Sequence, residues 1–185
     1  KLNNFNKKYL IYIDQDLLGH PAFFIEKRKA WANKNFYKKL NKLFYLLEKK
    51  YGQKIKIALH PKNKSFNNLF SSRYKCYYDK TAELIRDSSH VLTHYSTAVS
   101  FVVLFNKPIT FLTSNELNQL RPGAQVTKLS QELKSHIINI DNKKKKFKLK
   151  KKFDKKAYKR YLNKYVKHPK SSGKNSLISL FNYIN

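Results

Sequence analysis

The chain has 185 residues, 40 Lys and Arg against 11 Asp and Glu, a net charge of +29, and 41% hydrophobic residues. This length suits one compact domain, and the apolar content excludes a disordered polybasic chain. A single cysteine, Cys76, excludes a disulfide framework and a metal site built from several cysteines. The longest nearly apolar run, residues 98–105, is far shorter than the ~20 residues that span a bilayer, so we expect no transmembrane helix.

Residues 8–13 are predicted to form the first strand, which runs into a polar loop. Residues 36–51 carry apolar side chains at helical spacing, and Gly52 is expected to end that helix. Residues 55–59 form the second predicted strand. The stretch 61–79 has no clear period, and we predict a loop with short turns there.

The same alternation continues in the second half of the chain. Residues 81–86 are predicted to form a short helix, 91–93 a third strand and 98–106 an apolar, buried helix. Residues 108–112 and 137–140 are the fourth and fifth predicted strands. Strands that alternate with helices predict an α/β fold, a Rossmann-like parallel sheet with helices on both faces.

The composition changes after residue 142. Residues 143–160 carry twelve basic residues and a single acid, Asp154. Apolar side chains interrupt this run, so we expect it to dock partly on the domain; they are Phe147, Leu149, Phe153 and Tyr158. A polar break precedes an amphipathic helix predicted at about residues 175–183.

The basic excess permits several interpretations. Only five of the 40 basic residues are Arg, and the chain is also rich in Asn, Ile, Tyr and Phe, so compositional bias in the source organism explains it without any function. The functional alternatives are a nucleic-acid surface, an anionic membrane face and a phosphorylated substrate. The scarcity of Arg and the lack of a zipper, zinc-finger or aromatic RNA-binding signature disfavour nucleic acid.

Three polar clusters follow predicted strands, and these are Asp14-Gln15-Asp16, His60-Pro61 and His94-Tyr95-Ser96-Thr97. Parallel sheets bind ligands beyond the carboxyl ends of their strands, next to the following helices. Hydroxyl groups at a helix start cap it, and the free N–H groups there attract phosphate. A plain helix cap at Ser96 and Thr97, and a loop histidine bonded to backbone at His60, stay open as alternatives.

The order strand, His-Pro, strand, Ser-Thr, buried helix and Asn-Lys-Pro-Ile resembles the C-terminal half of GT-B glycosyltransferases, from about residue 9 to 140. It is most similar to bacterial sialyltransferases and to capsule or lipooligosaccharide glycosyltransferases that use CMP-activated sugars. The resemblance implies that His60 and Pro61 contact the cytidine-phosphate portion of the donor and that Ser96 and Thr97 hold its phosphate. Two further donor-binding candidates stand beside these motifs, Gln15 and His94.

The sequence also departs from the family pattern. The acidic motif ending in Gly, which holds the sialyltransferase catalytic base, is not found, so we assign no catalytic residue. Ser100 and Phe101 stand where many GT-B enzymes carry a ribose-binding Glu-Ala pair, which favours CMP-sugars over UDP-sugars. Asp14 and Asp16 alone are weak evidence for a metal, and the resemblance implies neither a metal nor a cofactor.

We therefore expect a Rossmann-like nucleotide-sugar-binding domain over residues 1–142, a Lys-rich segment docked on or next to it over 143–170, and an amphipathic helix over 171–185. The chain begins with Lys and lacks Met, so we interpret it as a piece of a longer or processed protein without a signal peptide. The resemblance implies an enzyme of surface polysaccharide or lipooligosaccharide synthesis. Its expected partners are a nucleotide-sugar donor, a glycan acceptor and the N-terminal half of the same enzyme.

The expected location is cytoplasmic, peripheral on the inner face of the inner membrane. The residues expected to contact anionic lipid are Lys143, Lys144, Lys145, Lys146, Lys148, Lys150, Lys151 and Lys152, with Phe147, Leu149 and Phe153 inserting shallowly. The alternatives are a basic α/β module that binds anionic membrane or nucleic acid, and another envelope-polymer transferase with the same fold.

Overall fold

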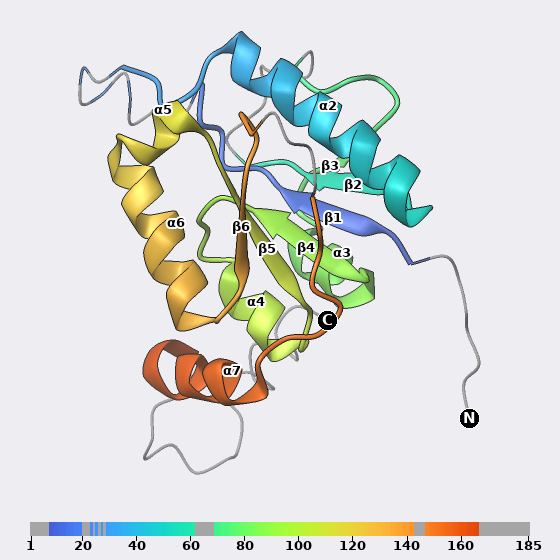
Figure 1. Ribbon diagram of the computed structural model, residues 1–185, viewed down its shortest axis with the longest axis vertical. Coiled ribbons are helices and arrows are strands. Elements are labelled where there is room, and N and C mark those ends of the chain that lie inside the picture. The colour runs from blue at the N-terminus through green and yellow to red at the C-terminus, as the bar shows by residue number, and fades with distance from the viewer. Residues whose placement is uncertain are drawn as a thin grey trace.

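The computed structural model describes residues 8–19, 23, 25, 27, 29–61, 69–142 and 147–166. In this part of the chain six parallel strands form one sheet in the order β3-β2-β1-β4-β5-β6 (Figure 1). The strands are β1 (Leu10–Ile13), β2 (Ile55–Ala58), β3 (Lys75–Tyr77), β4 (His90–Thr93), β5 (Ile109–Thr113) and β6 (His136–Asn139). The predicted Rossmann-like α/β fold is confirmed.

Side chains on the strands alternate between two hydrophobic cores, one on each face of the sheet. On the central strand β1, Leu10 and Tyr12 belong to the first core, and Ile11 and Ile13 belong to the second. This is the period of two expected when both faces of a parallel sheet are covered. Neighbouring strands pair in register, with Leu10 opposite Ile55 of β2 on one side and opposite His90 of β4 on the other.

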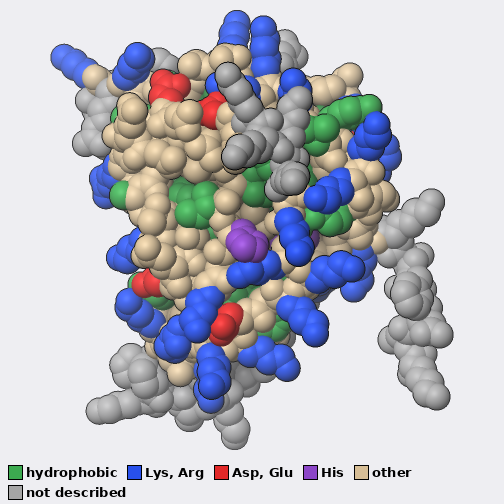
Figure 2. All heavy atoms as spheres, viewed as in Figure 1, with side chains coloured by type: hydrophobic (Ala, Val, Ile, Leu, Met, Phe, Trp, Pro, Cys, Tyr) green, Lys and Arg blue, Asp and Glu red, His purple; other side chains and the backbone are tan. Residues whose placement is uncertain are grey.

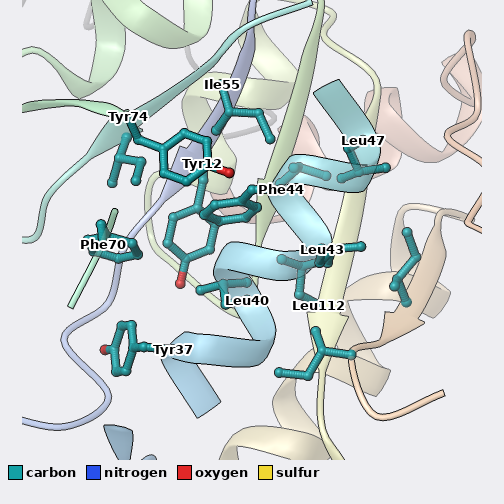
Figure 3. Close-up of a cluster of buried hydrophobic side chains, with 14 of the residues drawn as sticks. Tyr12, Tyr37, Leu40, Leu43, Phe44, Leu47, Ile55, Phe70, Tyr74 and Leu112 are labelled. Carbon is teal, nitrogen blue, oxygen red and sulfur yellow. The ribbon is translucent and has the colours of Figure 1, made fainter. Parts of the chain in front are cut away.

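The first face is covered mainly by α2 (Lys34–Tyr51). The Asn33 side chain accepts a hydrogen bond from the Phe36 N–H at 3.0 Å and caps its start. Gly52 ends the helix with a left-handed φ of 65°, which side chains with a Cβ rarely adopt. Figure 3 shows the apolar stripe of α2 packed on the sheet; its labelled members are Tyr37, Leu40, Leu43, Phe44 and Leu47.

The second face is covered by α3 (Thr81–Asp87), α4 (Val99–Leu104), α6 (Arg121–Glu132) and α7 (Lys155–Tyr161), which is followed by a π-helical turn, η1 (Leu162–Val166). The short helix α5 (Asn115–Asn118) precedes α6 and contributes Leu117 to the first core. Gly123 sits where α6 meets α5, and a Cβ there would lie 2.5 Å from the Leu117 carbonyl oxygen.

Several elements differ from the sequence-based expectations. The predicted loop over residues 61–79 contains the edge strand β3, which is too short and too exposed to show a periodic pattern. The helices α5 and α6 were not expected, and the helix predicted at 98–106 is limited to Val99–Leu104. The predicted helix at 175–183 lies outside the described residues, as do Lys143, Lys144, Lys145 and Lys146.

The Lys-rich segment contributes to both cores. Residues 147–154, which we call the strap, cross the face that α2 covers and lead into α7 (Figure 1). Phe147 and Leu149 are buried in the first core, and the Leu149 N–H donates to the Tyr51 hydroxyl at 2.7 Å. Beyond the strap, Tyr158 is buried in the second core and its hydroxyl donates to the Lys107 carbonyl at 2.7 Å.

Candidate functional site

The strand order creates a crevice at the carboxyl edge of the sheet. The chain moves from β1 to β2 and β3 on one side, then returns to β4, β5 and β6 on the other. The loops that leave β1 and β4 therefore diverge, and ligands of doubly wound folds bind in this gap. The two loops carry polar residues that the sequence singled out, residues 14–16 after β1 and residues 94–97 after β4.

Gln15 joins the two loops across this crevice. Its side-chain oxygen accepts a hydrogen bond from the Tyr95 N–H at 2.8 Å. Just below, the Thr93 hydroxyl donates to the Ile13 carbonyl at 3.3 Å. These bonds fix the spacing of the two loops, so Gln15 positions the crevice that it was expected to line.

Ser96 and Thr97 form the turn that enters α4. The Ser96 hydroxyl accepts from the Ala98 N–H at 3.2 Å, and the Ser96 and Thr97 carbonyls accept from Val99 and Ser100. Ser96 is half-buried and Thr97 is exposed. Within the described residues, neither the Thr97 hydroxyl nor the backbone N–H groups of Ser96 and Thr97 have a hydrogen-bond partner. This turn can therefore donate hydrogen bonds to an anion.

His60 and Pro61 lie at the end of β2, on the other side of β1. The ladder continues one residue past the strand, because the Leu59 N–H donates to the Tyr77 carbonyl at 2.8 Å. His60 is half-buried and Pro61 is exposed, so both border the open carboxyl edge. The fold thus brings the His-Pro and Ser-Thr motifs to one edge, separated by the single strand β1.

His94 serves the core rather than a donor, which corrects the expectation that it contacts a nucleotide. Its ring is fully buried, with Nδ1 2.8 Å from the Leu112 carbonyl and Nε2 3.1 Å from the Tyr12 hydroxyl. A carbonyl only accepts, so Nδ1 carries the proton and Nε2 accepts from Tyr12. Burial lowers the pKa of His94 to about 4, and the Leu112 carbonyl opposes this shift, so the ring is neutral at pH 7.

The sequence singled out Asp14 and Asp16 after the first strand but did not predict that both are buried at the start of the crevice. Asp14 and Asp16 are both buried, and Asp16 has a left-handed φ of 49°. One oxygen of Asp16 accepts from the Gly19 N–H at 3.0 Å, which shapes the loop after β1. The pKa of the Tyr37 hydroxyl is raised, first by burial and then by the charges of Asp14 and Asp16. The signal available in the sequence was the Asp-Gln-Asp pattern directly after a buried strand.

The strap lysines lie away from the crevice. Along the strap, the buried residues Phe147 and Leu149 alternate with the exposed residues Lys148 and Lys150. Figure 2 shows many Lys and Arg side chains on the face of the molecule that it presents. The ring of His90, the first residue of β4, donates a hydrogen bond to the backbone carbonyl of Lys150, so the strap reaches the amino edge of the sheet at this residue. Because Phe147 and Leu149 are buried in the core, they are not available to insert into a membrane, contrary to our expectation.

Among the residues that the structure describes, no three His, Cys, Asp or Glu side chains come together as a metal site would require. No helix in the same residues has the length and apolar character needed to cross a bilayer.

No protein-family model and no curated protein matches the sequence. Solved structures with some similarity include a UDP-GlcNAc 2-epimerase from Methanocaldococcus jannaschii (16% identity, TM-score 0.46), covering 84% of this chain and 44% of the epimerase. KpsC from Thermosulfurimonas dismutans, a beta Kdo 2,4 transferase, has 13% identity and a TM-score of 0.37, covering 59% of this chain and 35% of KpsC. The glycotransferase of kitacinnamycin has 12% identity and a TM-score of 0.38, covering 75% of this chain and 32% of that protein. The chain therefore spans less than half the length of each of these proteins.

Proposed function

We propose that this chain is the nucleotide-sugar-binding half of a GT-B glycosyltransferase and that its donor is a CMP-sugar. One observation carries the proposal. The strand order β3-β2-β1-β4-β5-β6 brings the His-Pro and Ser-Thr motifs to the same edge of the sheet, on either side of the β1 loop. This is the edge at which doubly wound folds bind nucleotides.

The spacing of the two motifs suits a nucleoside monophosphate. His60 follows β2 and Ser96 follows β4, and β1 lies between these strands. Strands lie about 4.8 Å apart, so the two loops begin about 10 Å from each other. In this arrangement His60 and Pro61 contact the cytidine portion while Ser96 and Thr97 contact the phosphate.

The turn at residues 96–97 offers donors to the phosphate. The Thr97 hydroxyl is exposed, and it and the two backbone N–H groups have no acceptor among the described residues. When the bond to the sugar breaks, negative charge grows on the leaving nucleotide, and preorganised donors stabilise it. The Gln15 bridge to Tyr95 holds this turn in place before the donor arrives.

The remaining catalytic groups come from elsewhere in the proposed enzyme. A base on a second Rossmann-like half would deprotonate an acceptor hydroxyl, which then attacks the anomeric carbon and expels the nucleotide. The carboxylates next to the crevice, Asp14 and Asp16, are buried and so cannot reach an acceptor held above the edge. We expect the isolated chain to bind nucleotide without turning donor over.

The proposed pathway is synthesis of a bacterial surface polysaccharide or lipooligosaccharide, at the inner face of the inner membrane. Four described strap lysines are exposed and lie away from the carboxyl edge, so they leave the crevice open when they contact anionic lipid; they are Lys148, Lys150, Lys151 and Lys152. The same four lysines support the alternative function, an anion-binding module without catalysis.

Calorimetric titration with CMP, UMP and GMP tests the nucleotide site. We expect CMP to bind most tightly and His60→Ala to weaken it by roughly 1–3 kcal/mol, the range for a hydrogen bond to a charged group. His136→Ala is the matched control, because His136 is an exposed histidine on the edge strand β6. Equal affinity for all three nucleotides, unchanged by His60→Ala, would remove the donor-site assignment.

A further inference from the structure

A separate cavity of about 560 Å³ lies at the same edge of the sheet, beyond β5 and β6. It is lined by the first half of α2, the start of α5, the residues that follow β6, and Phe147 of the strap. Its size falls within the range of small-molecule sites. None of the nucleotide-site residues lines it, so it is distinct from the crevice between the β1 and β4 loops.

One wall of the cavity is apolar. It is formed by Phe36, Leu43 and Leu46 of α2 together with Ile140 and Phe147. Phe36 and Phe147 line the cavity although both are more than nine-tenths buried. An apolar wall with aromatic members suits the C–H face of a ring.

The rest of the lining is polar and is already ordered by hydrogen bonds. Asp141 accepts from Lys39 Nζ at 2.5 Å and from the Asn115 N–H at 2.8 Å. Although partial burial raises the pKa of Asp141, these two bonds outweigh it and keep the pKa below the usual range, so the carboxylate is charged. Asn33 Nδ2 lies 3.5 Å from Glu116 Oε2, which links the starts of α2 and α5.

The charges in the cavity narrow the class of ligand. Asp141 and Glu116 would repel a phosphate group with two negative charges more strongly than a single carboxylate, and both can accept hydrogen bonds from hydroxyl groups. Lys39 is paired with Asp141, but Lys42 is exposed and forms no ion pair with any carboxylate of the described residues. The cavity therefore offers an apolar wall, several hydroxyl partners and one unpaired cation.

We propose that this cavity binds an acidic saccharide unit, with its ring against Phe36 and Phe147 and its carboxylate at Lys42. Its hydroxyl groups donate to Asp141 and Glu116 and accept from the amides at the rim. The evidence for this saccharide site is the cavity alone, so it does not depend on whether the crevice binds a nucleotide.

The test is a ligand-observed NMR titration with glucuronic acid, N-acetylneuraminic acid and neutral glucose. We expect an acidic sugar to bind more tightly than glucose, and Lys42→Gln to reduce its affinity about tenfold, as loss of a charge-assisted hydrogen bond predicts. Lys38→Gln, an exposed lysine of α2 outside the cavity, is the matched control and should bind as the parent does.

A second variant addresses the cavity itself. Leu46→Trp fills the apolar wall and should abolish saccharide binding while CMP binding is retained. His60→Ala should show the reverse pattern, so failure of the nucleotide site and failure of the saccharide site can be told apart. Absence of binding by all three sugars, or binding unchanged in both Lys42→Gln and Leu46→Trp, would overturn the proposal.

Discussion

Mild acid should destabilise the fold through two buried histidines. His94 is hydrogen-bonded to Leu112 and Tyr12, and His90 Nε2 lies 2.9 Å from the Thr110 hydroxyl. Burial is the main cause that lowers the pKa of each ring from 6.5 to about 4. The unfolded chain takes up protons first as the pH falls below 6.5, so stability is fully present above that pH and is lost progressively down to about pH 4.

The size of the effect follows from these pKa values. At pH 5 a histidine with a pKa of 6.5 in the unfolded chain is almost fully protonated, whereas one with a folded pKa of about 4 is mostly neutral. The linkage relation then gives a loss of about 2 kcal/mol per histidine between pH 7 and pH 5, or about 4 kcal/mol for both. Carboxylates whose pKa the fold lowers, such as Asp141, add their effect mainly below pH 5.

Urea unfolding at pH 7 and pH 5, followed by circular dichroism, measures this loss. His94→Asn keeps a donor for the Leu112 carbonyl but does not titrate, so about half of the pH dependence should disappear. His136→Gln removes an exposed histidine and should leave most of the dependence in place. A loss below about 1 kcal/mol in the parent chain, or an NMR titration that gives His94 a pKa near 6.5, would refute the reasoning.

Four further results are expected. Gly123→Ala should lower the free energy of unfolding by about 1–3 kcal/mol, because the new Cβ would lie 2.5 Å from backbone atoms of α5, whereas Ala124→Ser on the exposed side should have little effect. Glu48→Ala should cost about 2 kcal/mol in urea unfolding, since it leaves the buried Ile55 N–H without its acceptor. Replacing Ser96 and Thr97 together by Ala should cost at most about 1 kcal/mol of stability, while calorimetry shows a larger loss of CMP-binding free energy. A large loss of stability with unchanged CMP binding would show that both residues serve the fold and not the ligand. Liposome sedimentation should show that the protein binds anionic vesicles but not neutral ones, and that salt weakens this binding. Changing four exposed lysines to Gln should abolish the binding without loss of stability; they are Lys148, Lys150, Lys151 and Lys152. If the variant still binds anionic vesicles, compositional bias is the better explanation of these lysines.

The sequence predicted five of the six strands because each contains a short apolar run between polar residues. Central strands such as β1 and β5 are buried along their whole length, which gives a continuous apolar signal. The edge strand β3 has two exposed residues and one half-buried residue, so no such signal exists. Helix α6 was missed because Pro122 and Gly123 at its start suggest a loop, although Pro in the first turn of a helix is favourable.

The candidate site was predicted in part. The positions of the His-Pro and Ser-Thr motifs follow from strand ends, which sequence patterns locate well. The role of His94 does not follow, because a histidine beside a Ser-Thr pair gives no sign that Tyr12 and Leu112, distant in sequence, enclose its ring. The cavity beyond β5 and β6 was not predictable for the same reason, since it is assembled from α2, α5, the residues that follow β6 and the strap.

The strap has a consequence for the order in which the protein forms during synthesis. All six strands and most helices precede residue 147, so they leave the ribosome before Phe147 and Leu149 do. Until those side chains arrive, the first core lacks part of its cover and apolar surface stays open to other chains. The nascent domain is therefore expected to depend on chaperones until the strap has packed on the first core. The lysines that alternate with the apolar residues of the strap keep it soluble before it packs.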